Sequence, residues 1–223
     1  MQAPDARKLE IAGPAGRLQA SLTSPAQPHL QAVVAHPHPL YGGTMDNLVV
    51  LQTALAFSKR GAETLRFNFR SVGHSDGRHS EGRGEVDDLH AALHGLPKQT
   101  PDLPIVLAGY SFGGAMALAL MTRSEDPPAR QPNGLLLLAP PMTHYDFATL
   151  ESCTLPVAVI YGENDDLTPL HLVRSSLGSR DPEHTLATGI SGVGHDLGTS
   201  VSGDGLSEAL DRSLDWLLEK IRP

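Results

Sequence analysis

Hydrophobic residues along the chain form short apolar runs, separated by longer stretches in which they recur at mostly helical spacing. Runs such as Ala32–Ala35 and Ile105–Ala108 are continuously apolar, which is typical of strands covered by helices on both faces. The first two expected strands flank a Gly-Pro-Ala-Gly turn and predict an antiparallel hairpin. The expected strands are Lys8–Ile11, Arg17–Leu22, Gln31–Ala35, Glu63–Phe69, Ile105–Gly109, Gly134–Ala139, Val157–Tyr161 and His184–Thr188.

Helices are expected between and after these strands, at Met45–Lys59, Glu85–Leu96 and Gly114–Met121. A last helix places Leu206, Leu210, Leu214, Leu217 and Ile221 on one apolar stripe. A hairpin followed by alternating strands and helices predicts one α/β domain over residues 1–223, with a mostly parallel sheet of about eight strands. Ligands of such sheets bind beyond the carboxyl ends of the strands, so candidate chemistry is sought in the loops there.

Composition narrows the class of protein. The 223 residues carry a formal net charge of -8 and 19% charged residues, which disfavours a broad nucleic-acid-binding surface. Cys153 is the single cysteine, so neither an intrachain disulfide nor a thiolate metal cluster is expected. The N-terminal stretch Met1–Ile11 has no apolar core of a secretory signal, and no run reaches the length of a membrane span. We expect a cytoplasmic protein without nucleic-acid or membrane partners; its oligomeric state is left open.

A serine lies in the turn Gly-Tyr-Ser-Phe-Gly at residues 109–113, between an expected strand and an expected helix. The motif G-x-S-x-G in this context holds a serine hydroxyl above the sheet, beside the positive end of the helix. A glycine-rich turn that merely contains a serine is the alternative. Because strand, glycines and helix follow in the required order, Ser111 is the predicted nucleophile, and the amide of Phe112 is one predicted oxyanion donor.

Acidic residues follow the strand Val157–Tyr161 in the loop that contains Glu163, Asp165 and Asp166. A carboxylate at this position can accept a hydrogen bond from a histidine and stabilise its charged form. The local sequence does not decide which of these three carboxylates pairs with the histidine, and Asp146 after the preceding strand is a further alternative.

His195 differs from the other histidines because it follows the last expected strand in a glycine-rich loop. It also completes the chain order Ser, Asp, His that is found in one large class of serine hydrolases. We predict that it takes the proton of Ser111 during attack and returns it to the leaving group.

The loop after the third strand, His-Pro-His-Pro-Leu-Tyr-Gly-Gly at residues 36–43, is expected to supply the second oxyanion donor. Proline has no amide hydrogen, so Leu40 is the preferred donor and Tyr41 is the next choice.

The same loop offers a metal interpretation, because His36 and His38 are two residues apart and Asp165 or His195 could supply further ligands. That interpretation leaves the serine motif unexplained, and we expect no metal or organic cofactor. The consecutive residues 74–76, His-Ser-Asp, cannot converge on one another and predict a loop. Glu85, Asp87 and Asp88 are interpreted as favourable charges at a helix N-terminus.

Most of the chain resembles the small bacterial α/β-hydrolases described as dienelactone-hydrolase-like or carboxylesterase-like. The matching segments are HPHPLYGGTMDN at 36–47, FNFRSVGHSDG at 67–77, the serine turn at 109–113, the pattern G-x-x-D-x-x-x-P at 162–169, and Gly-His at 194–195. The resemblance implies a catalytic triad of Ser111, Asp165 and His195, with an oxyanion hole near Leu40 and Phe112. Ser71 stands where the group usually has glycine. Serine also stands where true dienelactone hydrolases have a cysteine, so that activity is not implied.

Many members of this superfamily insert a helical cap between the sixth and seventh strands, and here the connecting segment is too short for one. We therefore expect an open site that suits short acyl groups, with Tyr41, Arg70, Tyr110 and His144 contacting the substrate.

The expected function is hydrolysis of carboxylic esters or related small-molecule acyl compounds through an acyl-enzyme. A thioesterase or a peptidase with the same triad is an alternative, because the triad does not select the leaving group. A non-catalytic binding protein on this fold is an alternative of a different class.

Overall fold

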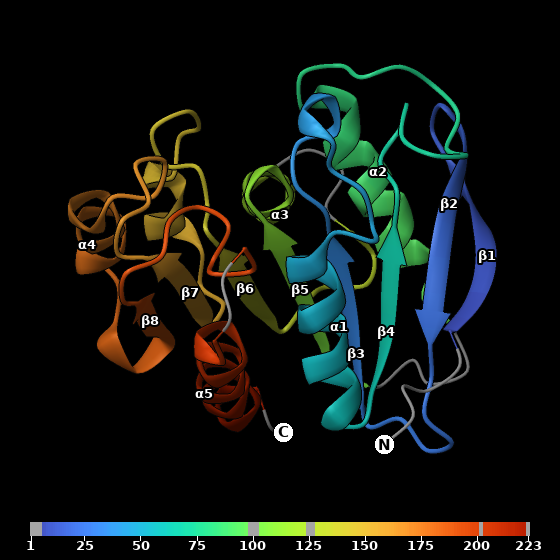
Figure 1. The fold of residues 1–223 in the computed structure, drawn as a ribbon. Coiled ribbons are helices and arrows are strands. Elements are labelled where there is room, and N and C mark those ends of the chain that lie inside the picture. Colours follow the sequence, from blue (N-terminus) through green and yellow to red (C-terminus); the bar gives the residue numbers. More distant parts are fainter. Residues whose placement is uncertain (1–5, 98–102, 124–127, 201–202, 222–223) are drawn as a thin grey trace.

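The computed structural model describes residues 6–97, 103–123, 128–200 and 203–221. Residues 1–5, part of the stretch predicted not to be a secretory signal, lie outside the described residues. Its centre is an eight-stranded sheet in the order β1-β2-β4-β3-β5-β6-β7-β8 (Figure 1). All eight expected strands are present, with ends that differ by a few residues. The strands are β1 (Ala6–Gly13), β2 (Gly16–Thr23), β3 (Leu30–Ala35), β4 (Ala62–Phe67), β5 (Ile105–Tyr110), β6 (Gly134–Leu138), β7 (Val157–Gly162) and β8 (Thr185–Ile190).

The sheet is antiparallel only at one edge, where β1 pairs with β2 and β2 pairs with β4. Every other neighbouring pair is parallel. The carboxyl ends of β3 to β8 therefore lie along one edge, which is uppermost in Figure 1. The predicted α/β fold with a mostly parallel sheet is confirmed.

Helices cover both faces of the sheet. On the near face in Figure 1, α1 (Leu48–Lys59) and α5 (Gly205–Lys220) bury apolar stripes against the strands. On the other face, α2 (Arg83–His94), α3 (Phe112–Thr122) and α4 (Leu170–Gly178) pack over a second apolar cluster. Because both faces are covered, the central strands are buried along their whole length, as their uninterrupted apolar runs predict.

Capping residues explain where the helices begin. The helix expected from Met45 begins at Leu48, because the side chain of Asn47 accepts a 2.9 Å hydrogen bond from the amide of Val49. The helix expected from Glu85 begins at Arg83, because the carboxylate of Glu85 reaches back to the amide of Gly82 at 2.9 Å.

Helix α4 (Leu170–Gly178) is not among the helices predicted from the sequence. This nine-residue helix follows Pro169 and buries Val173 and Leu177. Its hydrophobic residues at Leu170, Val173 and Leu177 have helical spacing over only two turns, and so short a stretch is difficult to distinguish from a loop.

No cap covers the strand ends between β6 and β7, where the described chain forms only the short 3₁₀ helix η2 (Ala148–Ser152). Within the described ranges, every helix is too short or too polar to traverse a lipid bilayer. The loops that carry the candidate chemistry are therefore not enclosed by an inserted helical domain.

Candidate active site

Ser111 occupies a strained turn between β5 and α3. Its backbone has φ 52 and ψ -119, a conformation that is costly for a residue with a side chain and is often found at functional sites. The flanking glycines are required by close backbone contacts. A Cβ at Gly109 would lie 2.3 Å from the carbonyl carbon of Gly113, and a Cβ at Gly113 would lie 2.5 Å from the carbonyl oxygen of Ala35.

The imidazole of His195 links Ser111 to Asp165. Its Nε2 lies 2.8 Å from Ser111 Oγ, and its Nδ1 lies 2.9 Å from Asp165 Oδ2. An ionised carboxylate can only accept a hydrogen bond, so Nδ1 carries the proton and Nε2 has a free lone pair. That lone pair points to the serine hydroxyl, which is the geometry required of a general base.

Asp165 is held in the charged form that this geometry requires. Its side chain is fully buried, and burial by itself raises the pKa of a carboxyl group. The hydrogen bond and charge of His195 and the amide of Leu167 outweigh burial, so the pKa of Asp165 lies below its ordinary value. The competing Asp166 is exposed, and the exposed Asp146 accepts from the amide of Ala148.

The loop that carries His195 is fixed from two sides. Tyr110, at the end of β5, donates its hydroxyl to the backbone carbonyl of His195 at 3.0 Å. The amide of Asn164 donates to Val193 at 3.0 Å. Tyr110 was predicted to contact substrate, but its side chain is buried and its hydroxyl is engaged, so it supports the His195 loop instead.

In the turn after β3, the amides that were predicted to bind an oxyanion donate hydrogen bonds within the turn itself. It contains the 3₁₀ helix η1 (Pro39–Tyr41). The amide of Leu40 donates to Nδ1 of His38 at 3.2 Å, and the amide of Tyr41 donates to the carbonyl of His38 at 3.1 Å. Both predicted donors from this loop are thus engaged within the turn. The amide of Phe112 is the first of α3 and, like other helix N-terminal amides, has no acceptor within its helix.

Comparisons with known proteins show the family of the chain. Solved structures of three bacterial proteins superpose over nearly the whole chain. A protein of unknown function from Agrobacterium tumefaciens is 32% identical, covering 97% of this chain and 99% of that one, with a TM-score of 0.84. An alpha-beta serine hydrolase homologue from Coxiella burnetii is 30% identical, covering 97% of each chain, with a TM-score of 0.77. This chain belongs to the α/β-hydrolase superfamily.

Three further comparisons describe proteins and a family similar to this hydrolase. A serine hydrolase without lid from Xanthomonas campestris is 28% identical over 98% of this chain and 96% of its own, with a TM-score of 0.81. The family model for serine aminopeptidase, S33, matches residues 40–148. A curated relative, an uncharacterized protein from Rickettsia prowazekii, is 38% identical over 70% of this chain. That alignment spans only 65% of the rickettsial protein.

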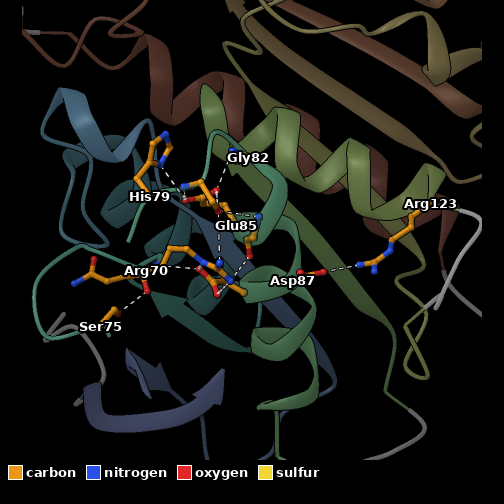
Figure 2. Close-up of polar contacts among 11 residues, drawn as sticks. Arg70, Ser75, His79, Gly82, Glu85, Asp87 and Arg123 are labelled. Carbon is orange, nitrogen blue, oxygen red and sulfur yellow. Dashed lines mark hydrogen bonds and ion pairs between the residues drawn. The ribbon is translucent and has the colours of Figure 1, made fainter. Parts of the chain in front are cut away.

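Arg70 of the hydrolase is a structural residue, although it was predicted to contact substrate. Its guanidinium donates to both carboxylate oxygens of Asp88, at 2.9 and 2.8 Å, and to the carbonyl of Gly84 at 2.7 Å. Figure 2 shows Arg70 beside α2, where Asp87 also pairs with Arg123, the residue that follows α3. Asp87 and Asp88 were predicted only to interact favourably with the helix N-terminus, and they also form ion pairs with arginines.

The other predicted substrate residues have different surroundings. Tyr41 is 86% exposed, and its ring lies 4.8 Å from that of His38. His144 is exposed and contacts its neighbour Thr143, so its role in substrate binding stays a prediction. Tyr145 was not among the predicted site residues, but its ring lies 6.0 Å from that of Phe112. Tyr145 also lines a cavity of about 330 Å³ with Met142, Asp146, Phe147, Ala148, Glu151, Leu172, Ser175 and Ser176.

His36 does not have the free nitrogen that the metal interpretation requires. Its Nε2 accepts from the amide of Phe69 at 3.0 Å, and its Nδ1 lies 2.6 Å from the carbonyl of Pro37. Burial lowers the pKa of His36 to about 4, so the ring is neutral and donates through Nδ1. Both ring nitrogens thus tie the strand end to neighbouring backbone. Within the residues that the structure describes, no group of three or more His, Cys, Asp and Glu could hold a metal ion.

The close contacts of the serine turn predict that Gly113→Ala damages the site. The new Cβ would meet backbone atoms of the β3 end, and such overpacking costs about 1–3 kcal/mol. We expect a lower midpoint in urea unfolding and loss of covalent labelling of Ser111 by a fluorophosphonate. Gly178→Ala is the matched control, because nothing lies within 4 Å of its Cβ position. Equal behaviour of the two variants would contradict the close packing of the turn.

Proposed function

We propose that this hydrolase cleaves carboxylic ester bonds of small acyl compounds through a covalent acyl-enzyme, with Ser111 as nucleophile. The observation that carries the proposal is the bridging imidazole of His195, hydrogen-bonded at 2.8 Å to Ser111 and at 2.9 Å to Asp165. Serine, a general base and a carboxylate in this order are the groups required for acyl transfer.

The reaction begins when Ser111 Oγ attacks the acyl carbon and its proton passes to His195 Nε2. Asp165 stabilises the resulting imidazolium. Collapse of the tetrahedral intermediate breaks the bond to the alcohol, which leaves with the proton from His195. Water then repeats the sequence on the acyl-enzyme, releasing the carboxylic acid and restoring Ser111.

The oxyanion of the tetrahedral intermediate needs two amide donors, and we assign them to Phe112 and His38. The amide of Phe112 is free at the start of α3. In the turn after β3, the prolines have no amide hydrogen and the amides of Leu40 and Tyr41 are engaged. Among the described residues the amide of His38 has no acceptor, and the ring of His38 lies 4.8 Å from that of Phe112. Loss of one such donor typically lowers kcat by about 10²–10³.

A peptidase that removes N-terminal residues is the second candidate, because the matching family model describes a serine aminopeptidase. The cavity beside Tyr145 includes the carboxylates of Asp146 and Glu151, which would suit a substrate amine. Preference for aminoacyl p-nitroanilides over p-nitrophenyl esters would favour this candidate over the esterase.

A fluorophosphonate probe tests the proposed nucleophile. We expect the wild-type protein to be labelled and Ser111→Ala to remain unlabelled, with esterase activity reduced by a factor on the order of 10⁶, as expected for removal of a serine nucleophile. Absence of labelling in the folded wild-type protein would contradict the proposal and favour a non-catalytic binding protein. Activity that disappears with a chelator and survives in Ser111→Ala would favour the metal interpretation.

The absence of a cap predicts the acyl-chain preference. Each methylene group enclosed by protein gains about 0.8 kcal/mol, or roughly a fourfold increase in kcat/KM. An open site encloses few of them, so kcat/KM for p-nitrophenyl esters should be flat or falling from acetate to decanoate. A steady rise toward decanoate would show that an enclosed acyl channel exists and would contradict the open site.

A further inference from the structure

Two buried carboxylates lie one turn apart on α2. The side chains of Glu85 and Asp88 are both 0% exposed. A buried carboxylate is costly unless it is paired with a cation and hydrogen-bonded. Arg70 supplies the cation for Asp88 through two hydrogen bonds, so Glu85 needs a cation of its own.

Glu85 is prepared to be ionised. Its carboxylate accepts hydrogen bonds from the amide and the hydroxyl of Ser80 and from the amide of Gly82, at 2.9, 3.0 and 2.9 Å (Figure 2). Burial by itself raises the pKa of Glu85, but these hydrogen bonds and the charge of His79 outweigh burial and lower it below its ordinary value. The side chain therefore carries a negative charge close to the start of α2.

His79 is the side chain in position to balance that charge. Its Nδ1 lies 2.9 Å from Glu85 Oε1, and its side chain is 10% exposed. Within the described residues, Nδ1 is nevertheless a buried nitrogen without an acceptor in hydrogen-bonding geometry. Coulomb attraction does not require the alignment that a hydrogen bond needs. A protonated Nδ1 would attract the carboxylate at this distance, whereas an unprotonated Nδ1 would bring a lone pair against those of Oε1.

The other side of His79 faces the loop of the candidate active site. Its ring lies 5.0 Å from that of His38 and 6.0 Å from that of Phe112. Burial lowers the pKa of His38, the charge of His79 lowers it further, and Glu85 partly opposes these effects. A neutral His38 can accept the hydrogen bond that the amide of Leu40 donates to its Nδ1 at 3.2 Å, and a protonated ring cannot.

The remaining titratable groups at this cluster come from two other segments. Tyr41 of η1 lies beside His38, and Tyr145 of the segment after β6 lies beside Phe112. Burial, with the charge of Glu85 and the effect of Tyr41, raises the pKa of Tyr145 above its ordinary value, so Tyr145 stays neutral where histidines titrate. Arg70 is held by Asp88. His38 and His79 are thus the two histidines that face one another at this cluster.

We propose that His79 and Glu85 form a buried ion pair that positions the side chain of His38 and, through it, the η1 turn beside the nucleophile. His79 is a positioning residue, since it acts through His38 and not on the reacting atoms. Its effect on catalysis rests on the ester hydrolysis proposed above, whereas its effect on His38 does not. The pair links the segment before α2 to the loop that we assign to the oxyanion hole.

Imidazole NMR titration of the wild-type protein and His79→Gln tests the positioning directly, with the His38 signals assigned by comparison with His38→Gln. Loss of the cation leaves Glu85 facing His38, so we expect His38 to titrate at a higher pH in His79→Gln. His79→Lys keeps a positive charge and should shift the titration back toward wild type. An unchanged His38 titration in folded His79→Gln would overturn the proposal. This measurement does not depend on activity, so an inactive wild-type protein would refute the proposed function alone.

The kinetic consequence is a pH-dependent loss in His79→Gln. Protonation of His38 releases the amide of Leu40, so the ratio of variant to wild-type kcat should fall as pH is lowered from 8 to 6. We expect a fall of roughly tenfold, a fraction of what losing a whole oxyanion donor costs, with little change in KM. His74→Gln is the matched control, because His74 is an exposed histidine of the same loop. A loss that is equal at all pH values, or equal in the control, would contradict the proposal.

Discussion

The hydrogen-bonded imidazole of His195 is the interaction on which the candidate site depends. It connects three loops that are far apart in the sequence, after β5, β7 and β8. The fold brings them together because these strands are parallel and end at the same edge of the sheet. The hydrogen bonds of Asp165 and the charge of His195 outweigh burial and keep the carboxylate ionised, which fixes the proton on Nδ1 and leaves Nε2 facing Ser111.

The precision of this arrangement comes from small residues and from supports behind the reacting groups. Glycines at the serine turn allow contacts that no side chain would permit. Tyr110 holds the His195 loop through its backbone, and His38 closes the η1 turn through its own ring. Buried polar groups of this kind stabilise a structure only when their partners are in place. The same holds for the pair of Arg70 with Asp88 and for the proposed pair of His79 with Glu85.

The strand positions and the candidate nucleophile could be predicted because their signals are local. Continuous apolar runs indicate buried strands. The glycine pattern around Ser111 indicates a turn without any information about tertiary contacts. The roles of Arg70 and Leu40 could not be predicted in this way. Arg70 meets Asp88 and the amide of Leu40 meets the ring of His38 only after folding, and spacing along the chain does not reveal which polar partner is satisfied. The N-cap before Glu85 is glycine, so the sequence carries no capping-box signature that could have indicated its buried position.

The most direct test of this account is a comparison of Asp165→Asn with Asp166→Asn in ester hydrolysis. An asparagine at 165 removes the charge and favours the wrong tautomer of His195, for which a fall in kcat of about 10⁴ is the expected scale. The exposed neighbour at 166 should tolerate the same substitution with little change. Near-wild-type activity of Asp165→Asn, or an equal loss in both variants, would contradict the role assigned to the bridging imidazole.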